Sequence, residues 1–341
     1  MTRPSLPPGL TAEAFGPAHR QVADAAVDSA ARGFWRDSWE RLRRRRAAMV
    51  SLVVLALISV AAVVAIWFSP HDPTAQQTLF VNLPPRIPGL GIPGWDGTTV
   101  IGGERVDKYA LVGVPADVHF LLGTDGLGRD LLSRLLMGVR VSLGIALVAA
   151  VLDLTLGVTY GLVSGLAATG IDTAMQRVLE VLSGIPTLVV LVLMLTVFSP
   201  GVVSIVLALV VTGWIPMARL VRAQTLRLKD REFVLAAEVL GARRFRIAVR
   251  HVLPNVMGVV VVQTMFTIPT AIFFEAFLSF IGLGLRPPTA SLGTLLDEGF
   301  DTFTFLPYQM LVPALTLSVI MIAFNLLADG LRDAFDPRSR R

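Results

Sequence analysis

Long apolar runs without charged residues dominate the hydrophobic pattern of the chain. The first run extends from Ala47 to Phe68 and contains 22 residues. As a helix that rises ~1.5 Å per residue it would be about 33 Å long, enough to cross the ~30 Å hydrocarbon layer of a bilayer. The run is too long, and begins too late in the chain, to be a cleavable signal peptide. We therefore predict a first membrane-spanning helix at residues 47–68.

Five further apolar runs predict five more spans, and hence an all-α polytopic membrane protein with six transmembrane helices. They cover residues 141–168, 178–198, 202–217, 256–285 and 311–328. The chain then divides into an N-terminal tail (1–46), the first span (47–68), an external segment (69–138), a helical core (139–336) and a short tail (337–341). The core holds spans two to six and one polar loop at residues 219–253.

The composition agrees with a membrane protein. Hydrophobic residues make up 54% of the chain and charged residues 16%, against roughly 25% charged in ordinary soluble domains. The chain has no cysteine, which excludes structural disulfides and thiolate metal sites. The net charge of +5 comes from arginines beside apolar runs, so it indicates membrane orientation rather than binding to nucleic acid.

The distribution of basic residues predicts which loops face the cytoplasm. The loop between the fourth and fifth spans has three acids and nine basic residues: Arg219, Arg222, Arg227, Lys229, Arg231, Arg243, Arg244, Arg246 and Arg250. Basic loops are retained in the cytoplasm. Since six spans return the chain to its starting side, we expect both termini to be cytoplasmic as well, and the segment 69–138 to be external.

The external segment predicts a small insert after the first helix. Prolines and glycines cluster between Pro84 and Gly94, which is typical of a loop. The alternation of residues from Thr98 to Val112 then indicates a short β-hairpin.

The sequence lacks residues that several enzyme classes require. A phosphate-binding loop of the form G-x-x-x-x-G-K-[ST] needs a lysine after a glycine, whereas Lys108 and Lys229 follow an aspartate and a leucine. No two of the four histidines lie one helical turn apart and none falls in a predicted span, which argues against intramembrane metalloproteases and serine proteases. We therefore expect no catalytic residue, no metal site and no cofactor bound by this chain.

Three acidic residues are intramembrane candidates: Asp153, Glu180 and Glu275. A charge at mid-bilayer costs ~2.5–3.5 kcal/mol on insertion scales, so such residues are functional candidates. Pairing is the structural alternative, since Arg177 and Glu180 share a helix face at i, i+3. A proton-coupled secondary carrier would use Asp153 or Glu275 as its proton site, and this is an alternative function.

The second span also carries a stripe of small residues. Gly157, Gly161 and Gly165 follow at intervals of four and share one helix face, which predicts close packing against another helix. Prolines such as Pro186 and Pro216 predict kinks in the following spans.

A short helix is predicted inside the polar loop, from Arg231 to a glycine that ends it at Gly241. The spacing A-A-x-x-x-G, followed by H-x-L-P at residues 251–254, resembles the coupling-loop signature, or EAA motif, of permease subunits of ATP-binding-cassette (ABC) importers. The resemblance implies that this helix docks into a cleft of a cytoplasmic ATPase. The residues implied in coupling are Leu235, Ala236, Ala237, Glu238, Gly241, Arg243, His251 and Pro254. Leu235 stands where the signature usually has glutamate.

A second block, before the second span, is similar to the G-T-D-x-x-G-R-D-x-x-S-R-L-L motif of dipeptide, oligopeptide and nickel permeases of the C type. It comprises Gly123, Thr124, Asp125, Gly128, Arg129, Asp130, Ser133 and Arg134. Its charges alternate in sign at helical or turn spacing. An external elbow whose charges pair with one another is therefore the structural alternative to a binding role.

Together the two motifs resemble a C-type permease subunit with the type I ABC importer fold. The resemblance implies a multi-pass protein of the bacterial inner membrane that imports peptides or related small solutes and is not itself an enzyme. The implied partners are a homologous B-type permease subunit, two cytoplasmic ATPase subunits that bind ATP and Mg²⁺, an external substrate-binding protein and the lipid bilayer.

Other functions are compatible with parts of this pattern. Within the family, nickel or another solute could replace peptides. Outside the family, the alternatives are the proton-coupled carrier and a membrane scaffold whose basic loop binds anionic lipid.

Overall fold

The computed structural model describes residues 34–335 except for residues 70, 90, 91, 93 and 116. The predicted tail at residues 337–341 and most of the tail at 1–46 therefore lie outside the described residues.

The described residues form helices and one small antiparallel sheet. The α-helices are α2 (Phe34–Arg44), α3 (Arg46–Phe68), α4 (Lys108–Val112), α5 (Leu131–Leu166), α6 (Thr169–Ser183), α7 (Thr187–Val197), α8 (Val202–Gly213), α9 (Ile215–Lys229), α10 (Glu232–Val239), α11 (Arg244–Ile247), α12 (Leu253–Phe280), α13 (Leu292–Asp301) and α14 (Tyr308–Phe335). A 3₁₀ turn, η2 (Thr78–Phe80), a π-helical turn, η3 (Ala248–Val252), and the strands β1 (Thr98–Ile101) and β2 (Glu104–Asp107) complete the fold.

Five described helices are long and apolar enough to cross a membrane, and the bent pair α6–α7 makes up to six. They are α3, α5, the α8–α9 helix Val202–Lys229, the α11–α12 helix Arg244–Phe280, and α14. The predicted all-α polytopic fold is confirmed. The bend of 76° between α6 and α7 lies at Pro186, which has no N–H to donate and disfavours helical geometry in the residue before it.

The α11–α12 helix (Arg244–Phe280) and α14 (Tyr308–Phe335) differ from the spans predicted at 256–285 and 311–328, and α5 and α9 extend beyond their predicted ends. α5 begins at Leu131, ten residues before the predicted span at 141–168, and α9 continues to Lys229 instead of ending near Met217. Both extensions contain polar residues, and several of these are buried against partners. The length of the apolar run therefore underestimates the length of the helix. The connection between α9 and α11 is consequently shorter than the predicted loop at 219–253.

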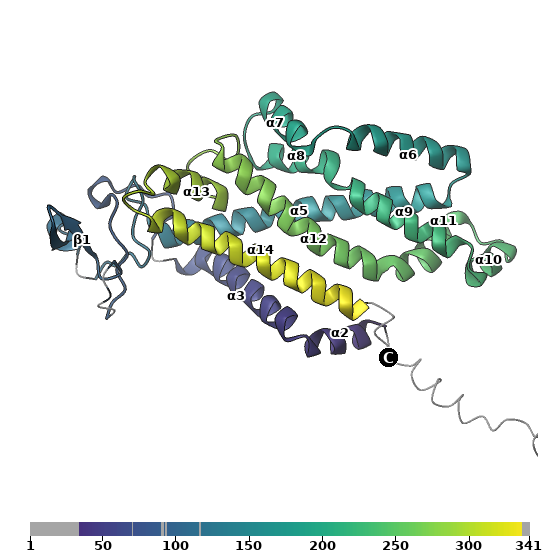
Figure 1. Cartoon of the computed structure of the whole chain (residues 1–341), viewed down its shortest axis with the longest axis horizontal. Coiled ribbons are helices and arrows are strands. Elements are labelled where there is room, and N and C mark those ends of the chain that lie inside the picture. The colour runs from purple at the N-terminus through teal and green to yellow at the C-terminus, as the bar shows by residue number, and fades with distance from the viewer. Residues whose placement is uncertain (1–33, 70, 90–91, 93, 116, 336–341) are drawn as a thin grey trace, which may run out of the picture.

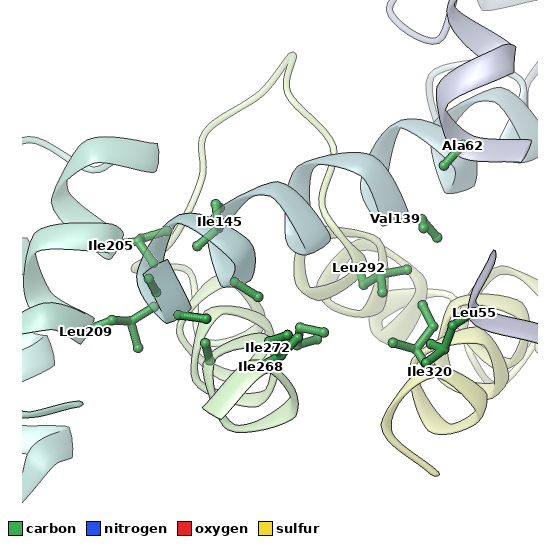
Figure 2. Packing of buried hydrophobic residues seen from close by; sticks show 14 of the residues in the cluster. Leu55, Ala62, Val139, Ile145, Ile205, Leu209, Ile268, Ile272, Leu292 and Ile320 are labelled. Atoms are coloured by element: carbon green, nitrogen blue, oxygen red, sulfur yellow. The ribbon is translucent and has the colours of Figure 1, made fainter. Parts of the chain in front are cut away.

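The bundle is held by one large core of aliphatic side chains. Figure 2 shows residues of this core from α3, α5, α8, α12, α13 and α14, including Leu55, Val139, Ile205, Ile272 and Ile320. Burying each such side chain contributes roughly 1.5–3 kcal/mol in water, but in a bilayer close packing contributes most of the helix association.

The predicted glycine stripe of α5 packs against α9. A Cβ atom at Gly157 would lie 2.6 Å from the Cβ of Met217, and one at Gly161 would lie 2.6 Å from the carbonyl oxygen of Ala218. Gly165 meets Thr225 in the same way. The two helix backbones approach closely because these three positions lack side chains.

The insert after α3 has a small core of its own. The predicted hairpin is present as β1 and β2, with Gly102 and Gly103 between them in left-handed conformations. Behind it, Leu83, Tyr109 and Phe120 form a buried cluster. The hydroxyl of Tyr308 in α14 donates to the carbonyl oxygen of Leu83 at 2.9 Å, which fastens the insert to the bundle.

The elements separate into two ends of the molecule. In Figure 1 the insert and α13 lie at one end, and α2, α10 and the end of α14 lie at the other. Two contacts join the N-terminal helices to the end of α14. The ring centroids of Trp35 and Phe335 are 5.8 Å apart, and Nη2 of Arg45 lies 3.1 Å from Oδ2 of Asp333. We call these the insert end and the α10 end.

Candidate functional site

At the α10 end, α10 is held against the bundle by one of its sides. Val234 is fully buried and Ala237 nearly so. Both belong to a second core that also contains side chains of α5, α9, α11, η3 and α12: Val158, Leu162, Met217, Val221, Ile247, Val252, Val256 and Val260. We call this cluster the α10-end core. α10 contacts α9 and α11, and this core joins it to α5 and α12 as well.

Exposed apolar side chains lie on α10, directly after it at Leu240, and in α11 at Phe245. Val239 and Leu240 are each 87% exposed, Phe245 is 80% exposed and Leu235 is 46% exposed. We call these four residues the α10 surface. Apolar side chains gathered at an exposed position outside the predicted spans are typical of a protein contact.

α10 ends at the glycine that the sequence predicts. Gly241 has φ +79°, its N–H donates to the carbonyl oxygen of Glu238 at 2.9 Å, and the N–H of Ala242 donates to that of Ala237 at 2.9 Å. These two bonds form a Schellman motif, which satisfies carbonyl groups at the end of a helix. A Cβ atom at Gly241 would meet no atom within 4 Å in this chain, so only the left-handed backbone restricts this position.

The other predicted coupling residues are distributed around the same connection. Ala236, Glu238 and Arg243 are exposed, whereas Ala237 faces the α10-end core. Pro254 lies in the first turn of α12, as predicted, but η3 precedes it without a break, so the helix starts at Arg244. Because a proline has no N–H, the helix accommodates it with a wider π turn, and this turn contains His251.

At the insert end, the G-T-D block folds as an elbow that leads into α5. Gly123 and Gly128 have φ of +79° and +72°. Their missing side chains leave room for the carbonyl oxygens of Leu83 and Gln77. Asp130 caps α5 by accepting bonds from the N–H of Ser133 at 2.8 Å and from its hydroxyl at 2.5 Å.

The charges of the elbow are buried and paired. The carboxylate of Asp125 accepts from Nε of Arg129 at 2.7 Å and from Arg134 at 2.5 Å. Glu298 of α13 accepts from Nη2 of Arg129 at 3.0 Å and also pairs with Arg134. Thr124, fully buried, donates to the carbonyl oxygen of Phe80. The two arginines and two carboxylates bring the block, α5 and α13 together.

Glu298 is the residue of this cluster that sequence reasoning missed. It lies 164 residues from Arg134, so no local spacing pointed to it. At the neighbouring position, burial raises the pKa of Asp297, and the nearby carboxylates of Asp301 and Glu298 raise it further.

The three intramembrane acids have different surroundings. Glu180 is exposed and pairs with Arg177 at 2.6 Å, as the i, i+3 spacing predicted. Glu275 is fully buried and accepts from the hydroxyls of Ser142 at 2.6 Å and Ser279 at 3.0 Å. Asp153 is also buried, but its Oδ1 has no hydrogen-bond partner among the described residues. Across those residues no group of three or more His, Cys, Asp or Glu side chains is placed to hold a metal ion.

Comparison with known proteins identifies the family. The family described as "Binding-protein-dependent transport system inner membrane component" matches residues 157–341, which is more than half of the chain. The chain belongs to this family. A second family, the "N-terminal TM domain of oligopeptide transport permease C", matches residues 33–85.

Two named relatives match this chain over almost its whole length. The dipeptide transport system permease protein DppC of Lactococcus lactis subsp. cremoris is 42% identical over 90% of this chain and 91% of its own. The oligopeptide transport system permease protein OppC of Bacillus subtilis is 37% identical over 96% of this chain and 97% of its own. The resemblance to C-type permeases is thereby confirmed.

The fold agrees with this assignment. A solved structure, titled as an inward facing conformation of the MetNI methionine ABC transporter, is similar with a TM-score of 0.50. It covers 60% of this chain and 97% of the solved chain at 18% identity. The inner membrane component therefore has the fold of an ABC transporter permease.

Proposed function

We propose that this permease forms one half of the translocation pore of an ATP-driven importer of peptides, beside a homologous B-type subunit. The relatives named as dipeptide and oligopeptide permeases support peptides as the solute class, because they cover nine tenths or more of this chain. A nickel importer is the alternative within the family.

The α10 surface is the observation that carries the proposal. Four exposed apolar side chains lie at one end of the molecule, and Leu240 directly follows a helix that Gly241 caps. In the proposed importer they dock into a cleft of a cytoplasmic ATPase subunit, which binds ATP and Mg²⁺ and hydrolyses the nucleotide. Aliphatic and aromatic side chains would supply the binding energy, with arginines such as Arg243 and Arg244 around them.

The α10-end core provides the route by which ATPase movement reaches the spans. Val234 and Ala237 belong to one core with residues of α5, α9 and α12, so a displacement of α10 would reach these three long helices through that core. Packed cores switch between discrete arrangements rather than deforming continuously, which suits alternating access. The π turn η3 would be the most adaptable part of this connection.

The same proposal fixes the orientation. The α10 end and both chain termini would face the cytoplasm of a bacterial cell, and the insert end would face an external substrate-binding protein. The basic residues around α10, against the acids Asp297, Glu298 and Asp301 at the insert end, support this orientation.

Substitution within the α10 surface tests the proposal. We expect Val239→Asp and Leu240→Asp to reduce ATPase co-purification with the permease at least tenfold and to abolish ATP-dependent peptide uptake, because a buried unpaired carboxylate disfavours docking. Leu111→Asp is the matched control, since Leu111 is also an exposed aliphatic residue, 64% exposed, but lies in the insert. It should leave ATPase co-purification unchanged.

Two results would contradict the proposal. One is normal ATP-dependent uptake with both α10 variants. The other is peptide uptake by the isolated chain, driven by a pH gradient without nucleotide, which would favour the secondary carrier.

A further inference from the structure

A cavity that is partly open to the surroundings is lined by α5, α7, α8, α9 and α12, away from both the α10 surface and the elbow. Its volume is about 210 Å³. Its polar lining comes from four helices and includes Asp153, Thr187, Thr212, Gln263, Thr267 and Thr270.

Asp153 is the residue that makes this cavity unusual. Its side chain is 97% buried, since its exposed fraction is 3%, and Oδ1 has no hydrogen-bond partner in the described part of the chain. Among the described residues that line the cavity there is no Lys, Arg or His. A buried carboxylate that is ionised and has no donor or counter-charge is strongly disfavoured, so it either binds a proton or pairs with a cation.

The surrounding helices are shaped to admit this carboxyl group. A Cβ atom at Gly213, the last residue of α8, would lie 2.5 Å from Oδ2 of Asp153. Glu275, the other buried acid of the spans, provides the contrast, because Ser142 and Ser279 satisfy it within the chain. Asp153 therefore has space and no partner, whereas Glu275 has partners.

The chemistry of the lining favours a protonated amine. An ammonium group carries three N–H donors and a positive charge, and it needs an anionic acceptor with neutral acceptors around it. Asp153 supplies the first, and the hydroxyl and amide oxygens of Thr187, Thr212, Thr267 and Gln263 are available as the second. Phe266 and Phe274 line the same cavity, and aromatic rings also attract cations.

We propose that this cavity is a subsite for the protonated amino group of the transported peptide, with Asp153 as the pairing carboxylate. This inference rests on the proposed function, since it requires a peptide to pass through the permease. The cavity is smaller than the roughly 300–1,000 Å³ of pockets that enclose a whole small molecule, so it accommodates a head group while the rest of the peptide lies outside it. A basic side chain of the partner permease is the competing occupant.

The first test uses the assembled importer in proteoliposomes with its substrate-binding protein. Asp153→Asn removes the charge and keeps the size, and should lower the number of peptides imported per ATP hydrolysed at least tenfold. Glu180→Gln is the matched acid-to-amide control on the exposed side of α6, and should leave this ratio within twofold. A purely structural role for Asp153 would lower uptake and ATP hydrolysis in parallel and leave the ratio unchanged, which would overturn the proposal.

A second measurement keeps Asp153 intact in case its variant does not assemble. Because the chain has no cysteine, Thr267→Cys provides a single thiol in the cavity, and its rate of labelling by a neutral maleimide reports whether the cavity is occupied. A peptide with a free amino group should slow labelling at least fivefold, whereas its N-acetylated derivative should not. Equal protection of the thiol by both peptides would overturn the amine subsite. A thiol that is unreactive even without peptide would also overturn it, and would indicate that a side chain of the partner permease occupies the cavity.

These results are separate from the proposed function. If the unsubstituted importer fails to take up peptides with ATP, the proposed function is wrong. If it takes them up and only the ratio or the protection fails, the amine subsite alone is wrong.

Discussion

The carbonyl oxygen of Gln77 lies where a side chain at position 128 would have to be. A Cβ atom there would be 1.9 Å from that oxygen, and Gly128 also has φ +72°. We expect Gly128→Ala to destabilise the protein by at least ~2 kcal/mol, from overpacking and from a left-handed residue with a side chain. The measurement is the thermal unfolding midpoint of the purified protein in detergent.

Gly126→Ala is the control for this prediction. Gly126 lies in the same elbow, but a Cβ atom there would meet nothing within 4 Å. Its unfolding midpoint should stay within about 1 °C of the original protein. If Gly128→Ala were equally harmless, the elbow would not require the close approach of Gln77.

Single residues also show where sequence reasoning reaches its limit. Asp153 and Glu275 look alike in the sequence, since each is one acid in an apolar run. Only the fold brings Ser142 to Glu275, across 133 residues, and leaves Oδ1 of Asp153 without a hydrogen-bond partner among the residues that the structure describes. The pairing of Arg177 with Glu180 was predictable because both residues lie within one helical turn.

At the scale of elements, α5 and α9 depend on the glycine stripe between them. We expect Gly161→Ala to destabilise the protein by about 1–3 kcal/mol, because the new methyl group would lie 2.6 Å from the backbone oxygen of Ala218 and force the helices apart. Gly144→Ala, on a face of the same helix where a Cβ atom meets nothing within 4 Å, is the control.

Gly161→Ala should lower the unfolding midpoint, whereas Gly144→Ala should leave it unchanged or raise it. Alanine favours a helix over glycine by up to ~1 kcal/mol, so Gly144→Ala should be neutral or stabilising. Equal effects at both positions would mean that the α5–α9 contact is not tightly packed.

The ends of the elements were predictable where the signal is local. The glycine after α10 and the glycines between β1 and β2 each determine a turn from their own conformation. The start of α5 was not predictable from hydropathy, because Ser133 and Arg134 are polar. Both are nevertheless buried, because Ser133 is hydrogen-bonded to Asp130 and Arg134 is paired with Asp125. Glu298, from the distant helix α13, also pairs with Arg134.

At the scale of the whole molecule, α12 connects the two ends. Val256 and Val260 belong to the α10-end core, while Glu275, further along the same helix, pairs with Ser142 of α5. The hydroxyl of Ser142 also accepts from the N–H of Leu292, the first residue of α13, at 3.2 Å. α13 in turn supplies Glu298 to the elbow. Contacts therefore run without interruption from α10 to the elbow, and the proposed coupling to an ATPase would have a continuous packed path through the molecule.

Orientation in the membrane is the last property that this arrangement predicts. Because the chain has no cysteine, Leu240→Cys and Leu111→Cys each place one thiol at opposite ends of the molecule, both at exposed positions. In intact cells a membrane-impermeant maleimide should label position 111 in the insert and leave position 240 unlabelled until the membrane is permeabilised. The basic loop at the α10 end determines this outcome, since basic segments are retained in the cytoplasm. Labelling of position 240 alone in intact cells would reverse the orientation and place the α10 surface beyond reach of any cytoplasmic ATPase.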